Sequence, residues 1–117
     1  MKILGIRHCA VSEAAEEFAG LLDALGLERM PFDDGNGGGF SGAIFPAGSS
    51  WIELWPAGDG MPAGTMLQIV VDDADAFAAH ARQNGLEPKG PTDAHGERIY
   101  FLAAPGGMNI SFQSKVR

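Results

Sequence analysis

The sequence has few of the features that mark secreted, membrane or disulfide-linked proteins. Cysteine occurs once, at Cys9, which excludes an intrachain disulfide and fits a reducing compartment. No apolar run approaches the ~18 residues needed to cross a bilayer. The apolar residues after Lys2 are interrupted by Arg7 and His8, unlike the core of a secretory signal. We therefore expect a cytoplasmic protein with no membrane partner.

Basic residues are also scarce. Eight Lys and Arg residues, scattered singly, stand against 15 Asp and Glu residues, and the net charge is −7. Nucleic-acid binding depends on clustered basic side chains, so we expect no nucleic-acid partner. An acidic surface attracts cationic small ligands through its long-range field, or serves solubility alone. The length of 117 residues fits one domain whose core needs no disulfide.

The sequence repeats itself at a distance of about sixty residues. Residues 6–11 align with 66–71, residues 25–28 with 84–87, and residues 51–54 with 109–112, so the offset stays between 58 and 60. Two copies of one supersecondary unit usually pack together, and a site forms where they meet. The sequence therefore predicts modules at residues 1–56 and 64–117, joined by a Gly- and Pro-rich linker at 57–63, around a central cavity.

Each copy reads as a strand, a helix and three further strands. In the first copy we expect a strand over residues 2–11, a helix capped by Ser12 and ended by Gly26, a short strand over Glu28–Phe32, a turn over residues 33–39 and strands over 40–46 and 50–55. In the second copy Asp72 or Asp73 caps the helix. Helical spacing predicts these inner faces: Ala14, Phe18, Leu21, Leu22 and Leu25 in the first helix, and Ala74, Phe77, Ala78 and Ala81 in the second.

Alternation along the strands predicts which polar side chains face the cavity. The all-apolar sets should lie under the helices, so the mixed sets face the concave side. By repeat symmetry the first strand then presents Ile6, His8 and Ala10 there, with Cys9 on the helix side as an inert apolar group. Four side chains would share a centre: His8, Glu53, Gln68 and Ser111. They can bind a divalent metal completed by water, or hydrogen-bond a ligand or one another.

Two tryptophans accompany Glu53. Trp51 and Trp55 alternate onto the same face of their strand as this carboxylate. Large aromatic rings on a concave surface can stack a flat or cationic ligand, or they can fill the core or a dimer seam.

The closing segments resemble the vicinal oxygen chelate superfamily, which includes glyoxalases, extradiol dioxygenases and bleomycin-resistance proteins. The most specific pieces are residues 96–101 (GERIYF) and 104–112 (APGGMNISF), which are similar to the family's final Gly-strand, turn and strand. Residues 71–73 (VDD) before an Ala-rich helix look like the start of the family's second module. The resemblance implies an α+β fold in which two tandem βαβββ modules form a curved mixed sheet around a central cavity.

The resemblance also implies a place for a metal. Enzymes of this superfamily hold a divalent ion at four strand positions and use it as a Lewis acid. At these positions the chain has Glu53, which agrees with the family, Ser111 in place of Glu, Met66 in place of His, and Ile6 in place of His or Gln. Hydroxyl and thioether groups are poor ligands for hard divalent ions, so the metal site looks degenerate.

Our leading hypothesis is a homodimer that binds a small molecule in the inter-module cavity without a tightly held metal. His8 and Glu53 would be its polar anchors, Trp51 and Trp55 its walls, and Gln68 and Ser111 further contacts. The alternative is a metal-dependent lyase, isomerase or dioxygenase with a displaced site on His8 and Glu53. A third possibility is a metal-free enzyme in which the same pair transfers a proton.

Overall fold

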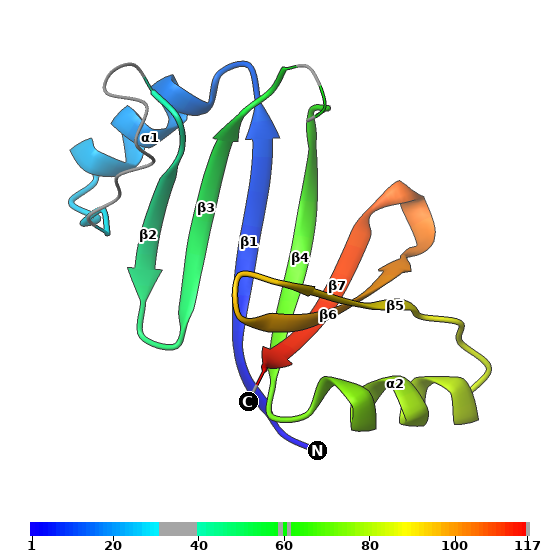
Figure 1. The fold of residues 1–117 in the computed structure, drawn as a ribbon. Coiled ribbons are helices and arrows are strands. Elements are labelled where there is room, and N and C mark those ends of the chain that lie inside the picture. The colour runs from blue at the N-terminus through cyan, green and yellow to red at the C-terminus, as the bar shows by residue number, and fades with distance from the viewer. Residues whose placement is uncertain (31–39, 59, 61, 117) are drawn as a thin grey trace. The chain divides into compact units, whose positions relative to one another are not determined.

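The computed structural model describes residues 1–30, 40–58, 60 and 62–116 (Figure 1). The chain forms β1 (Ile3–Ser12), α1 (Ala15–Ala24), β2 (Ala43–Ala47), β3 (Ser50–Pro56), β4 (Gly64–Val71), α2 (Ala74–Gln83), β5 (Lys89–Ala94), β6 (Glu97–Ala103), a 3₁₀ turn (Pro105–Gly107) and β7 (Asn109–Lys115). The strands form one mixed sheet in the order β2-β3-β1-β4-β7-β6-β5. The expected α+β fold with a mixed sheet is confirmed. Neither helix is long and apolar enough to span a membrane.

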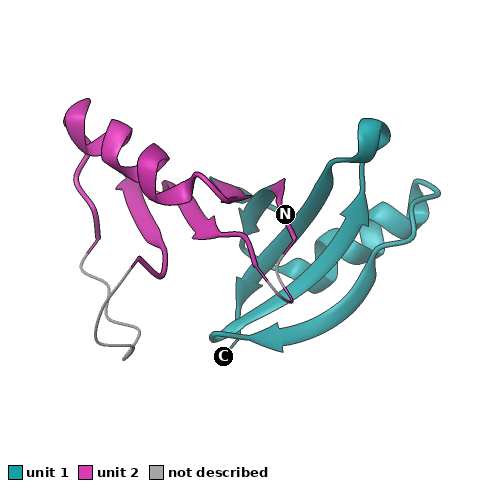
Figure 2. Ribbon diagram, turned by 90° about the horizontal axis from the view of Figure 1, so that it is seen from above, with its two compact units in different colours: residues 1–7, 66–117 teal, residues 8–65 magenta. Residues whose placement is uncertain are grey.

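The chain divides into two compact units, shown in Figure 2. Unit 1 comprises residues 1–7 and 66–117, and unit 2 comprises residues 8–65. Strand β1 therefore contributes residues to both units. The predicted module boundaries and the predicted cavity between the modules stay predictions.

Unit 2 is held by a small core under α1. Ala15, Ala19 and Leu22 of the helix pack with Ala10 of β1 and Leu54 of β3. The remaining core members are Ala43 and Phe45 of β2, with Phe40 and Ile52 packed beside them. Short alanine side chains let the helix backbone approach the sheet closely, so this core is thin.

The inner face of α1 differs from the predicted one. Of the large residues expected there only Leu22 is buried, whereas Phe18, Leu21 and Leu25 are 41, 58 and 68% exposed. The helix is rotated so that Ala15 and Ala19 face the sheet instead. The helical periodicity correctly identified the apolar side of α1. Two apolar stripes lie next to each other there, however, and the periodicity does not indicate which of them is buried.

Two other sequence expectations in unit 2 need correction or fall outside the structure. Residues 28–30 form no strand, although the Met30 N–H donates to the Ile44 carbonyl of β2 at 2.8 Å. The rest of that predicted strand, at residues 31–32, and the predicted turn at 33–39 lie outside the described residues. Ser12 does not cap α1 in the usual way: the N-cap is Ala14, whose own N–H donates to Ser12 Oγ.

Unit 1 also has a helix packed on strands, with aromatic residues in its core. Ala74 and Ala78 of α2 are fully buried against Val71, Tyr100 and Phe112. The rings of Tyr100 and Phe112 stack with centroids 5.3 Å apart. The predicted inner face of α2 is confirmed, and so is the predicted cap, because Asp73 accepts a hydrogen bond from the Ala76 N–H.

Candidate functional site

The helix-free face of unit 2 carries one carboxylate between two indole rings. Ile52 and Leu54 of β3 pack under α1, so alternation turns Trp51, Glu53 and Trp55 to the opposite face. The Trp51 indole N–H donates to Glu53 Oε2 at 2.6 Å, and the Trp55 indole N–H donates to Glu53 Oε1 at 2.9 Å. Each carboxylate oxygen thus accepts one hydrogen bond, which fixes the orientation of all three side chains. The predicted association of Glu53 with both tryptophans is present.

Trp55 is further held by the backbone at Gly42. This glycine has a φ of +138°, and a Cβ at this position would collide with the six-membered ring of Trp55. Only glycine combines this backbone conformation with such a close approach. The indole plane therefore lies against the chain just before β2, and its N–H remains directed at Glu53.

Cys9, and not His8, accompanies Glu53 on this face. Ala10 lies in the core under α1 with Leu54, so its alternating neighbour Cys9 lies on the opposite side of β1. Burial, and secondarily the negative charge of Glu53, raises the pKa of the Cys9 thiol to about 11. At neutral pH Cys9 is therefore a protonated, weakly nucleophilic group. The expectation that Cys9 points to the helix side is wrong, although its inert character agrees with the raised pKa.

His8 accordingly lies on the α1 side of β1 and is exposed. The error came from the repeat alignment, in which residues 6–11 were matched to 66–71 at an offset of 60. Equivalent buried positions, such as Ala19 and Ala78, are 59 residues apart. A register error of one residue moves every side chain of a strand to its other face. His8 and Glu53 therefore lie on opposite faces of neighbouring strands.

Unit 1 presents polar side chains on its own helix-free face. Gln68 of β4 and Ser111 of β7 are direct register partners in a parallel pair. Ser111 is 1% exposed and donates from Oγ to Gln113 Oε1 at 2.8 Å. Gln68 Oε1 is buried and accepts no hydrogen bond from the described residues. The predicted neighbours Gln68 and Ser111 are thus brought together, and Gln113 joins them.

An ion pair that the sequence analysis missed crosses this face. Arg7 of β1 binds Glu97 of β6 through two hydrogen bonds of 2.9 and 3.1 Å. The two side chains are only 12 and 17% exposed. Strands β4 and β7 lie between β1 and β6 in the sheet order, so the ion pair joins strands that are not neighbours in the sheet. The available signal was a charged residue in the middle of a first strand that is mostly apolar.

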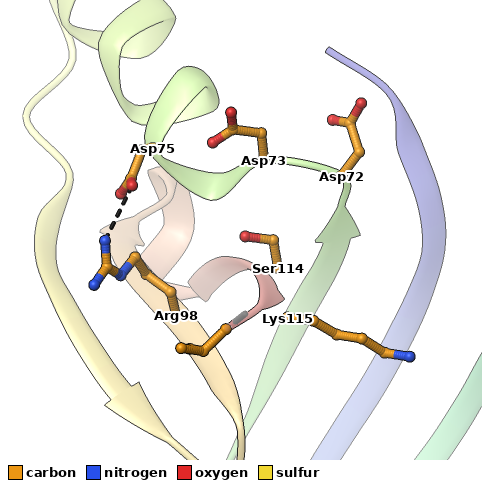
Figure 3. A pocket seen from close by; sticks show the side chains of 7 residues that line it. Asp72, Asp73, Asp75, Arg98, Ser114 and Lys115 are labelled. Atoms are coloured by element: carbon orange, nitrogen blue, oxygen red, sulfur yellow. Dashed lines mark hydrogen bonds and ion pairs between the residues drawn. The ribbon is translucent and has the colours of Figure 1, made fainter.

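A separate hollow in unit 1 lies beside the start of α2 (Figure 3). Its three aspartates already have structural partners. Asp72 accepts from the Lys2 backbone N–H, and Asp73 caps α2. Asp75 accepts from the Tyr100 hydroxyl at 2.6 Å and pairs with Arg98, and these contacts, the hydroxyl first, lower the pKa of its carboxyl. The aspartates that line the hollow therefore have structural roles around α2.

Metal-ligating side chains do not gather in the part of the chain that the structure describes. No group of three or more His, Cys, Asp and Glu residues there is placed to hold one ion. Of the four strand positions at which the resemblance places metal ligands, two have polar side chains that are already engaged: Glu53 accepts from two indole N–H groups, and Ser111 donates to Gln113.

Solved structures with the same arrangement of strands and helices support the fold. Hypothetical protein BH1468 from Bacillus halodurans C-125 aligns with a TM-score of 0.69 and 19% identity, covering 99% of this chain and 95% of its own. Methylmalonyl-CoA epimerase from Mycobacterium tuberculosis aligns with a TM-score of 0.64 and 19% identity, covering 98% and 88%.

A glyoxalase/bleomycin resistance protein/dioxygenase superfamily member from Vibrio splendidus 12B01 aligns with a TM-score of 0.63 and 11% identity, covering 94% of this chain and 97% of its own. The chain has the vicinal oxygen chelate fold. At these identities the likeness concerns the fold alone. No protein-family model matches the sequence, and no curated protein matches it. The vicinal oxygen chelate fold alone does not specify a function, which depends on the side chains that this chain places on it.

Proposed function

We propose that this chain binds a small organic molecule on the helix-free side of its sheet and holds it through side chains rather than through a tightly bound metal. The observation that carries the proposal is the buried, unsatisfied Gln68 Oε1 beside the buried Ser111. A sheet face with no ligand to bind would gain stability from apolar residues at such positions. An unsatisfied buried acceptor costs about 1–3 kcal/mol, so it calls for an explanation.

A ligand with an N–H or O–H donor would satisfy Gln68 Oε1. The proposed contacts are Trp51, Glu53, Trp55, Gln68 and Ser111, as the sequence analysis expected. His8, the sixth expected contact, lies on the α1 side of β1 and is left out of this set.

The geometry gives less support to an enzyme built on His8 and Glu53. A displaced metal site and a proton-transfer pair both need the two side chains on one face. Strand alternation separates them, since His8 shares a face with Ala10 and Glu53 lies opposite to Leu54. Both oxygens of Glu53 are also engaged by indole N–H groups. We therefore favour the binding function.

A thermal-shift screen of chemically diverse small molecules tests the proposal. A ligand at 100 times its Kd stabilises the folded chain by about 2.7 kcal/mol and raises the Tm accordingly. Changing Gln68→Leu should weaken binding of the hits about tenfold, because it removes the acceptor. Gln83→Leu, at the exposed end of α2, is the matched control. Absence of any saturable hit, or hits that bind Gln68→Leu as tightly as the wild type, would refute the proposal.

We also infer that the chain forms a homodimer through α1. Phe18, Leu21 and Leu25 form a continuous exposed stripe on this helix. Two copies related by a twofold axis would pack these stripes antiparallel, so the acidic first turn of one helix, with Glu16 and Glu17, lies near the C-terminal end of the other. That arrangement covers the apolar stripe and opposes complementary helix ends.

Sedimentation velocity at micromolar concentration tests the dimer. We expect a dimer for the wild type and a monomer for Leu21→Lys, because a charge at the centre of the stripe opposes burial. Leu86→Lys is the control, since Leu86 is similarly exposed, at 50%, but lies outside α1. A wild-type monomer, or a Leu21→Lys dimer, would exclude this interface.

A further inference from the structure

Building on the proposed function, we infer that the ligand carries an organic ammonium group and that Glu53 receives it between Trp51 and Trp55. The inference concerns the chemical class of the ligand. It rests on the charge of one side chain and on the groups that surround it in unit 2.

Glu53 is a partly buried carboxylate whose partners in the described chain are neutral. Its two oxygens accept from indole N–H groups at 2.6 and 2.9 Å. The ion pairs of the described residues involve Arg7, Arg29 and Arg98, and none of them includes Glu53. A partly buried charge is costly without a counter-charge. A ligand cation would supply one.

The remaining hydrogen-bonding capacity of Glu53 matches an ammonium group. A carboxylate has about four acceptor positions, and the two indoles use one on each oxygen. An ammonium N–H can donate to the free positions, and a quaternary ammonium can bind through charge alone. Tryptophan is the aromatic side chain that attracts cations most strongly. The overall charge of −7 favours the approach of such a ligand.

The same geometry favours an organic cation over a metal ion. A divalent metal needs several anionic or imidazole ligands in one shell. Cys9 lies within range of the charge of Glu53, and its thiol, with a pKa raised to about 11, is protonated at neutral pH and offers no anionic ligand. An ammonium group needs only one carboxylate and a surrounding of aromatic and weakly polar groups.

Tryptophan fluorescence gives a site-specific test, because the chain has only two tryptophans and both contact Glu53. The probes are choline and its neutral isostere 3,3-dimethylbutan-1-ol, titrated into the full chain. We expect a saturable change with choline and at least about tenfold weaker binding of the alcohol. No saturable response to choline, or equal binding of the two probes, would overturn the inference; this comparison needs no variant.

Two variants then test whether the charge that binds choline is the charge of Glu53. Glu53→Gln keeps the shape of the side chain and should weaken choline binding about tenfold, whereas Glu13→Gln removes one exposed acidic charge elsewhere and should leave it unchanged. Equal losses in both variants would mean that only the overall charge matters, which contradicts the inference. If the small-molecule screen yields neutral or anionic ligands sensitive to Gln68→Leu while choline fails, this inference falls and the proposed function stands. If neither gives binding, both fall.

Discussion

The two units share the same buried positions and differ in what they present on the other side. Pairs of residues 59 apart are equally buried in the two helices: Ala15 and Ala74, Ala19 and Ala78, Leu22 and Ala81. Alanine at five of these six positions lets each helix lie close to its strands. The repeat is therefore preserved where packing demands it.

The helix-free faces of the two units, in contrast, carry different side chains. Repeat symmetry makes Cys9 and Glu53 of unit 2 the counterparts of Gln68 and Ser111 of unit 1. In unit 1 the negative charge of the face, on Glu97, is balanced by Arg7 within the same unit. In unit 2 the negative charge of Glu53 meets two indole N–H groups. One unit thus balances its own charge, and the other has a charge that a ligand can balance.

The largest effects should come from the two cores, one in each unit. Phe112→Ala in unit 1 should lower the free energy of unfolding by about 3–5 kcal/mol, and Leu54→Ala in unit 2 by about 2–5 kcal/mol, because both leave cavities under a helix. Urea denaturation followed by circular dichroism measures both. Comparable losses would show that the two cores contribute equally to one cooperative transition. A loss below 1 kcal/mol in either would show that its unit can unfold without the other.

The same Glu→Gln change should have different effects in the two units. Glu97→Gln removes the charge partner of Arg7 and should cost about 2–3 kcal/mol, somewhat less than for a fully buried ion pair because the side chains are 17 and 12% exposed. Glu53→Gln should cost about 1 kcal/mol, since the amide nitrogen cannot accept from an indole N–H and one hydrogen bond is lost, while an unbalanced charge is relieved. Denaturant titration of the two variants provides the measurement. An equal cost would contradict the structural role given to one and the binding role given to the other.

The starts of the two helices should differ by a smaller amount. Asp73 caps α2 through the Ala76 N–H, so Asp73→Ala should destabilise the chain by about 1 kcal/mol. In α1 the N-cap residue Ala14 has no capping side chain, and Ser12 Oγ accepts only from the Ala14 N–H. Ser12→Ala should therefore cost about 0.5 kcal/mol or less. Thermal denaturation measures the stability of both variants. A larger destabilisation by Ser12→Ala than by Asp73→Ala would contradict this prediction.

Much of this fold could be predicted because buried residues recur along the sequence with the period of a helix or a strand. Most strands, both helices, the left-handed Gly26 that follows α1 and the cap at Asp73 follow from local chemistry. Residues 28–30, expected to open a strand, form none. The inner face of α2 could be read because it has a single apolar stripe. The inner face of α1 could not, because Phe18, Leu21 and Leu25 form a second stripe whose burial depends on something outside the unit.

The candidate site was less predictable, because it depends on register. Trp51, Glu53 and Trp55 share a face whatever the neighbouring strand does, so their association could be predicted from alternation alone. The placement of His8 required the alignment of two strands, and an error of one residue exchanged it with Cys9. The pairing of Arg7 with Glu97 joins residues 90 apart, and nothing local in the sequence specifies it.

The smallest effect concerns Cys9, which reports on the charge of Glu53. With a pKa of about 11, Cys9 should react with iodoacetamide at pH 8.5 about 100-fold more slowly than an exposed cysteine, because the thiolate is the reactive form. Glu53→Gln removes the smaller of the two causes of the raised pKa, so the rate should increase by less than about tenfold, while burial keeps it below that of the unfolded chain. Glu13→Gln should leave the rate unchanged. The single cysteine makes the reading unambiguous by mass spectrometry. If Glu53→Gln leaves the rate unchanged, Glu53 does not place its negative charge near Cys9, and the contrast between a self-balanced unit 1 and a ligand-balanced unit 2 loses its basis.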